Sequence, residues 1–215
     1  MDEKCWKVRR AALYYVSVLA KYDHNLLERI GEGELVEQLG DKLVEEHAMV
    51  SEMAFATFNT LVELISIDRG LITAEAQDEE ISLQRVKSSA LDVADNLIKE
   101  VTRRISIVLN NSKFNDQLKI ESSKILLRII QIYNHILINN EQESFNLINF
   151  VLDELKKTGI VENKCNLLAC LRELVSNEYP FAHYQRLWDY VFEQLARTST
   201  VKVQIIGFAI LRRIN

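Results

Sequence analysis

Proline and glycine are scarce in this chain, which has one Pro and six Gly among its 215 residues. Strands joined by tight turns need more of both, because proline presets a turn's backbone and glycine accepts conformations that other residues avoid. Apolar residues make up 48% of the sequence, which is enough for a sizeable core. The scarcity of turn residues therefore argues against a β-rich fold and predicts an all-α protein.

The chain also lacks long uncharged apolar runs. No run reaches membrane-spanning length without a charge, and residues 1–6 contain no apolar signal segment. The three cysteines, Cys5, Cys165 and Cys170, form an odd set without the spacing of a disulfide framework, which suits a reducing compartment. We therefore expect a cytoplasmic or nuclear protein with no membrane partner.

No group of residues typical of a catalytic or cofactor site is visible. The four histidines are far apart in the sequence, and a Gly-rich phosphate loop is absent. Glu45, Glu46 and His47 could ligate a metal, but no second His or Cys lies at ligand spacing. Cys165 and Cys170 are expected to be small core residues. We predict no enzyme activity, no cofactor, no metal and no small-molecule substrate.

The sequence does contain a helical unit with a repeated opening. Similar apolar helices open at Val8, Val50, Leu118, Val161 and Val201, at intervals of 42, 68, 43 and 40 residues. A period near 40 residues built from helix pairs is typical of HEAT and armadillo solenoids. The prediction is therefore an all-α, right-handed, HEAT/armadillo-type solenoid of about nine helices, as a single segment over residues 1–215.

Two sets of helices are expected to alternate along this segment. The B helices, which carry the repeated opening, are predicted at 8–22, 50–67, 118–138, 161–177 and 201–214. The A helices are predicted between them, at 25–47, 80–110, 143–157 and 182–197. The interval of 68 residues also holds an acidic break at 68–79, which we predict to be the most mobile internal segment. The alternative is that a degenerate repeat fills this interval in place of a loop and one long helix.

Local signals predict how some of these helices begin and end. Ser144 is a candidate N-cap for the A helix at 143–157, and Gly159 is expected to end that helix in a left-handed conformation. The last B helix carries apolar residues where natural solenoids have a polar cap, among them Ile205 and Phe208. We therefore expect a segment of a longer solenoid, and the alternative is a complete small protein whose ends a partner covers.

Charge is distributed unevenly between the two sets. The chain carries a net charge of −5, yet Lys and Arg exceed Asp and Glu on the B helices, whereas the A helices are acidic. B helices line the concave face of HEAT solenoids, so the pattern predicts a mildly basic groove that attracts an acidic partner. Ordinary solvated charge is the alternative. Nucleic acid is not expected, because the B helix at 50–67 is acidic and a duplex requires dense Lys and Arg.

Trp6 precedes the first predicted B helix and either packs onto the turn below or anchors a partner. The first role is favoured. Together with cations of the B helices it completes the set of candidate partner-binding residues: Trp6, Arg9, Arg10, Lys119, Lys124 and Lys202.

Three stretches carry a resemblance to a known family. Residues 6–12, Trp-Lys-Val-Arg-Arg-Ala-Ala, resemble a B-helix opening in the middle of the cullin-associated, neddylation-dissociated (CAND/TIP) family. Residues 50–64 are similar to that family's next B helix, and 118–121 to its later Leu-Lys-Ile-Asp opening. The family has an additional repeat where this chain has the helix at 80–110, so the chain resembles a shortened, divergent member.

The resemblance implies a non-catalytic scaffold that clamps a cullin and promotes exchange of substrate receptors on cullin–RING ubiquitin ligases. The family's best-defined contacts lie outside the matched region, so it implies no functional residue here. An importin-like transport or adaptor solenoid fits the architecture equally well. A tubulin-binding TOG-type array fits less well, because the turns at 46–49 and 198–200 are not basic.

Overall fold

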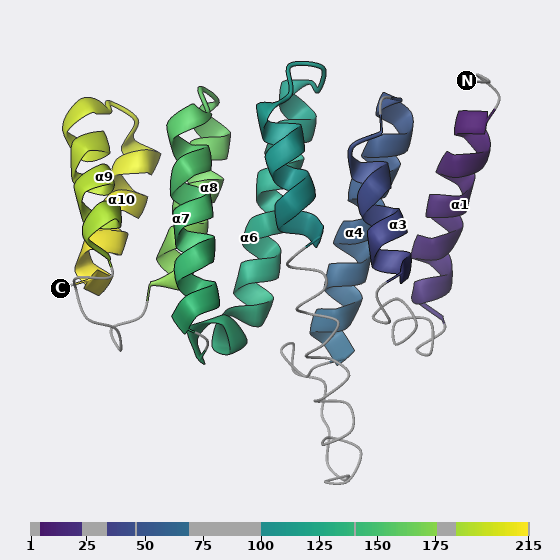
Figure 1. Ribbon diagram of the computed structural model, residues 1–215, viewed down its shortest axis with the longest axis horizontal. Helices are drawn as coiled ribbons and strands as arrows, with labels where there is room; N and C mark the ends of the chain where they lie inside the picture. Colours follow the sequence, from purple (N-terminus) through teal and green to yellow (C-terminus); the bar gives the residue numbers. More distant parts are fainter. Residues whose placement is uncertain are drawn as a thin grey trace, which may run out of the picture. The chain divides into compact units, whose positions relative to one another are not determined.

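The computed structural model describes residues 5–22, 34–45, 47–68, 100–139, 141–175 and 184–214, and these residues form nine helical segments and no strand (Figure 1). The predicted all-α class is confirmed for this part of the chain. The chain divides into two compact units, Met1–Ile125 and Leu126–Asn215, with the division inside α6 (Asp116–Asn139). The prediction of one solenoid segment stays a prediction.

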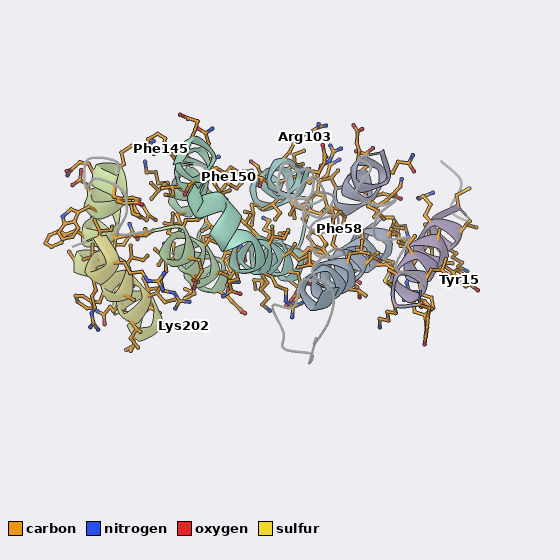
Figure 2. All side chains as sticks on the ribbon, turned by 90° about the horizontal axis from the view of Figure 1, so that it is seen from below. Tyr15, Phe58, Arg103, Phe145, Phe150 and Lys202 are labelled. Carbon is orange, nitrogen blue, oxygen red and sulfur yellow. The ribbon has the colours of Figure 1, made fainter. Side chains whose placement is uncertain are left out.

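The first unit contains α1 (Cys5–Ala20), α3 (Glu34–Leu43), α4 (Ala48–Asp68), a helical segment at 100–110 and the start of α6. α4 packs against both α1 and α3. Its buried side chains surround most of the helix and include Val50, Phe55 and Phe58. Figure 2 shows Phe58 among the helices and Tyr15 at the edge of α1. A helix buried on more than one face needs neighbours on both sides, as expected of a B helix.

The second unit consists of the end of α6 and two helical hairpins, which are α7 (Glu141–Lys157) with α8 (Val161–Leu174) and α9 (Gln185–Arg197) with α10 (Val201–Ile214). α7 packs against α8 and α9 against α10. Across the hairpins, α8 contacts α10 and α7 contacts α9. Figure 1 shows the turns of both hairpins at the same end of the unit. Each helix of the two hairpins therefore meets its hairpin partner and a helix of its own set.

The turn between α7 and α8 is built around Thr158. The Thr158 backbone N–H donates to the carbonyl of Glu154 at 3.1 Å, and its Oγ1 accepts the N–H of Ile160 at 3.3 Å. These bonds satisfy backbone groups that a helix end and a turn would otherwise leave unpaired. The prediction for Gly159 is wrong in its conformation, because its φ lies outside the left-handed region and Thr158 ends the helix instead.

The turn between α9 and α10 repeats this construction 40 residues later. The Thr198 N–H donates to the carbonyl of Gln194 at 2.9 Å, and Thr198 Oγ1 accepts the N–H of Thr200 at 3.2 Å. The interval between the two threonines equals the one between the openings at Val161 and Val201. The two hairpins therefore share one turn geometry, at the interval that the sequence predicts for a repeat.

Two of the predicted helices end earlier than expected, and the first of these ends involves a residue of another helix. The helix predicted at 25–47 ends at Leu43, where the Ser51 hydroxyl donates to the Leu43 carbonyl at 2.7 Å. A side chain from α4 thus satisfies a carbonyl at the end of α3. The helix predicted at 161–177 ends at Leu174, because Val175 is extended, with φ −79° and ψ 123°.

The start of α7 also differs from the prediction. The helix begins at Glu141, so Ser144 lies inside it and is not its N-cap. Ser144 is buried there. The cap prediction failed because the helix starts earlier than its apolar pattern shows.

Several predictions concern residues outside the described part of the chain. They are the helical stretches predicted at 25–33 and 80–99 and the acidic break predicted at 68–79. Of that break only Asp68, the last residue of α4, is described. Of the helices in the described part, none combines the length and apolarity needed to cross a membrane.

Candidate partner-binding surface

Trp6 lies in the first turn of α1, so the prediction that it precedes this helix is wrong. α1 begins at Cys5 and ends at Ala20, where the sequence predicted 8–22. The Trp6 ring stacks on His47, in the turn before α4, with ring centroids 4.4 Å apart and planes inclined by 15°. Trp6 therefore packs onto the turn between α3 and α4, which is the role favoured from the sequence.

Arg9 contributes to the same junction. Its Nε donates to Glu45 Oε1 at 2.7 Å, and Lys42 Nζ lies 3.3 Å from the other carboxylate oxygen of Glu45. Both partners of the Arg9–Glu45 pair are largely shielded, with side chains 28% and 15% exposed. Arg9 is therefore engaged within the fold, and we expect it to contribute to stability more than to a partner contact.

Arg10 lines a groove between α1 and α4, which we call the α1–α4 groove. Its lining residues are Trp6, Lys7, Arg10, Ala11 and Tyr14 of α1 and Met53 of α4, and its volume is about 340 Å³. Trp6, Arg10 and Tyr14 are spaced by four residues, which places them on one side of the helix. The lining is mainly apolar, with two cations from α1.

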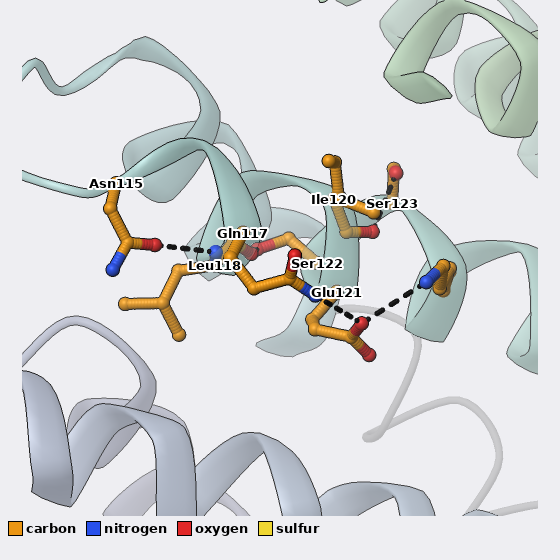
Figure 3. A network of polar contacts seen from close by, with 8 residues as sticks. Asn115, Gln117, Leu118, Ile120, Glu121, Ser122 and Ser123 are labelled. Atoms are coloured by element: carbon orange, nitrogen blue, oxygen red, sulfur yellow. Dashed lines mark hydrogen bonds and ion pairs between the residues drawn. The ribbon is translucent and has the colours of Figure 1, made fainter.

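Lys119 and Lys124 lie in the first part of α6. Figure 3 shows the polar contacts there, in which Asn115 Oδ1 accepts the N–H of Leu118 at 2.8 Å. Lys124 Nζ contacts Glu121 Oε1 at 3.1 Å, and Lys119 is half-buried. These two lysines are therefore less available than their sequence position suggested.

Lys202 is exposed on α10, in the second unit. It lies beside a row of exposed apolar residues at helical spacing, Val201, Ile205 and Phe208. The structure brings Trp6 and Arg10 to one groove, assigns Arg9 to an internal ion pair, and leaves the α6 and α10 lysines on other helices. The role of all six in binding stays a prediction.

Sequence reasoning missed four groove residues, which are Lys7, Ala11, Tyr14 and Met53. The four-residue spacing from Trp6 through Arg10 is a signal that could have found Tyr14. Met53 could not have been found in this way, because only the packing of α4 on α1 brings it to the groove.

The cysteines are placed as predicted from the apolar pattern. Cys165 and Cys170 are buried in α8, whereas Cys5 is exposed. Burial raises the pKa of both buried thiols, more strongly at Cys170. Within the described residues, no three or more His, Cys, Asp or Glu side chains gather closely enough to hold a metal ion.

No protein-family model and no curated protein matches the chain. Among solved structures, the chain is similar to the crystal structure of an engineered protein, with 13% sequence identity and a TM-score of 0.42. The match covers 97% of this chain and 91% of the engineered protein. At that score the similarity supports no inference about fold or function.

Proposed function

We propose that the chain belongs to a right-handed HEAT-type solenoid whose function is non-catalytic binding of a protein with an acidic surface. The observation that carries this proposal is the outer side of α1. Its apolar side chains Val8, Tyr15 and Leu19 are 70%, 63% and 52% exposed, and Tyr22, in the turn that follows the helix, is 83% exposed. The spacing of the first three places them on one side of α1, and a contiguous exposed apolar patch is typical of interaction sites.

The contacts of the second unit support the solenoid architecture. In a solenoid each helix pair packs on the next pair, so A helices contact A helices and B helices contact B helices. The contacts between α7 and α9 and between α8 and α10 have this pattern. The matching threonine turns, 40 residues apart, add a repeated local geometry.

The nature of the partner rests on charge and on the family resemblance. The exposed cations of the B helices favour an acidic partner, and the resemblance of residues 6–12 to CAND/TIP proteins favours a cullin-type scaffold in the ubiquitin conjugation pathway. A cytoplasmic or nuclear location would suit that role. A transport cargo or tubulin is the partner in the two alternative functions.

Binding to purified candidates tests the proposal. The full chain is immobilised and exposed to a cullin–RING complex, to tubulin and to a transport cargo. We expect binding to the cullin complex that weakens as salt rises, because exposed charges are screened. Absence of measurable binding to the cullin complex would contradict the proposed partner, and binding to tubulin or the cargo instead would support the corresponding alternative.

Charge reversal tests which surface binds. Arg10→Glu with Lys202→Glu alters exposed cations of the B helices, and Glu37→Lys with Asp189→Lys is the matched control on exposed acids of the A helices, with one change in each unit. Arg9 and Lys124 are unsuitable because each pairs with a carboxylate.

Asp41, which the sequence placed with the acidic A-helix surface, is unsuitable as a control because it pairs with the buried Arg104. We expect the cation reversal to lower the association rate, since peripheral charges act mainly on encounter. If only the acid reversal weakens binding, the acidic surface is the binding face.

A further inference from the structure

We infer that the α1–α4 groove is an anchor site for a short segment of the partner, in which one aromatic or long aliphatic side chain is flanked by carboxylates. This inference rests on the proposed function and specifies where and how the partner is held. The groove is independent of the outer side of α1, because Val8, Tyr15, Leu19 and Tyr22 do not line it.

The size and lining of the groove determine the apolar part of the ligand. A volume of about 340 Å³ is at the small end of ligand sites, so it suits one large side chain and not a whole folded surface. Ala11 leaves space between Trp6 and Tyr14, and Tyr14 is 54% exposed in the free protein. Met53 is flexible and polarisable, and methionine adapts its shape to apolar and aromatic groups.

The charges of the groove determine the polar part of the ligand. Lys7 and Arg10 line it, and none of the described lining residues is a carboxylate. Lys7 Nζ lies 5.7 Å from the centre of the Trp6 ring, so its charge is held near the groove. Arg10 is exposed and has no hydrogen-bond or ion-pair partner among the described residues. A carboxylate beside the inserted side chain would pair with Arg10 in the two-pronged geometry that guanidinium favours.

One wall of the groove, formed by Trp6, is held in place before a ligand arrives. Trp6 is held by its stacking on His47, and the neighbouring Arg9–Glu45 pair ties the start of α1 to the turn that follows α3. Ordering a flexible site costs binding free energy, so a site held in advance binds more tightly for the same contacts.

A peptide titration tests the inference. The probe is a fluorescein-labelled peptide, Asp-Glu-Phe-Glu-Asp, and binding to the full chain is followed by fluorescence anisotropy. One control peptide replaces Phe with Ser, and the other replaces all four acids with their amides. We expect both controls to bind at least about tenfold more weakly, as expected when a central contact of an interface is lost.

Two pairs of matched variants locate the site on α1. Arg10→Glu is compared with Lys21→Glu, an exposed cation outside the groove, and Tyr14→Ser with Leu19→Ser, an exposed apolar residue outside it. We expect the groove variants to weaken peptide binding by about tenfold and the controls by less than about twofold. Arg10→Glu removes no contact among the described residues, so it remains informative even if Tyr14→Ser fails to fold.

The possible results separate this inference from the proposed function. Equal binding of the amide peptide, or equal losses in the Lys21 and Leu19 variants, would overturn the groove as the anchor. The groove is also wrong if its variants bind the purified partner as the unmodified chain does, whereas protein binding would then stand. If the chain binds the peptide but no purified candidate partner, the groove stands and the proposed cullin, tubulin and cargo partners do not.

Discussion

The hydroxyl of Thr57 on α4 lies 3.1 Å from the carbonyl oxygen of Leu13 on α1, a residue 44 positions earlier in the chain. The same hydroxyl lies 2.8 Å from the carbonyl of Met53, within its own helix. Thr57 is fully buried, so its single hydrogen is shared between two helices away from water. This contact joins α1 and α4 one helical turn beyond Met53, which lines the groove.

Replacing Thr57 with valine should destabilise the protein by about 1 kcal/mol, the usual net contribution of one hydrogen bond. Valine keeps the shape of the side chain and removes only the donor. Thr60→Val is the matched control, because the Thr60 hydroxyl bonds only to Ala56 of its own helix and is exposed. Urea unfolding measures both variants, and equal stabilities would mean that the contact to Leu13 contributes nothing.

Replacing Gly207 with alanine should destabilise α10. Alanine normally favours a helix over glycine by about 1 kcal/mol. A Cβ at residue 207 would nevertheless lie 2.8 Å from Cδ2 and 3.1 Å from Cγ of Leu195 on α9, so the Leu195 side chain would have to leave its packed position. We expect a net loss of about 1–2 kcal/mol in thermal or urea unfolding.

Gly159 provides the control for that variant. A Cβ there meets nothing within 4 Å, and its φ is not left-handed. Gly159→Ala should leave stability unchanged or raise it by up to about 1 kcal/mol. A Gly207→Ala variant as stable as Gly159→Ala would show that Leu195 yields at no cost.

The thiols should react in two classes. Cys5 is exposed, whereas Cys165 and Cys170 are buried and burial raises the pKa of each thiol, which suppresses the reactive thiolate. An aromatic disulfide reagent should therefore modify Cys5 rapidly in the folded protein and the other two only after denaturation. Rapid labelling of the folded Cys5→Ser variant would contradict this placement.

Tyr190 should make the folded state less stable at high pH. Burial, reinforced by the nearby Glu193, raises the pKa of Tyr190 to about 12, above the value of about 10 in an unfolded chain. Between these values the unfolded state releases the proton and the folded state retains it, so stability falls as pH rises from about 10 to 12. The loss is on the order of 2 kcal/mol.

The Tyr190→Phe variant isolates this effect, since phenylalanine keeps the ring and cannot ionise. The stability difference between the two proteins should be constant below about pH 9 and should shift in favour of the variant above pH 10. A difference that stays constant to pH 12 would show that Tyr190 ionises alike in both states.

The sequence predicted the helices well because their apolar spacing is local information. Helix boundaries that depend on distant groups were not predictable in this way, as at Leu43, whose carbonyl is bonded by Ser51. The candidate site shows the same limit. Arg9 and Arg10 are adjacent and chemically alike, yet one is held by Glu45 and the other faces the groove. Only packing brings Glu45 to Arg9, so the sequence could not distinguish the two cations.

The threonine turns at 158–160 and 198–200 have a consequence for the order of folding. Each joins two helices through three residues, so α7 meets α8 and α9 meets α10 with little loss of chain entropy. Contacts between segments that are close in sequence form quickly, and domains begin to fold while the chain is still being synthesised. Each hairpin can therefore assemble as soon as it leaves the ribosome. The first helix of the hairpin then covers apolar side chains of α8 or α10 before those side chains can contact other chains.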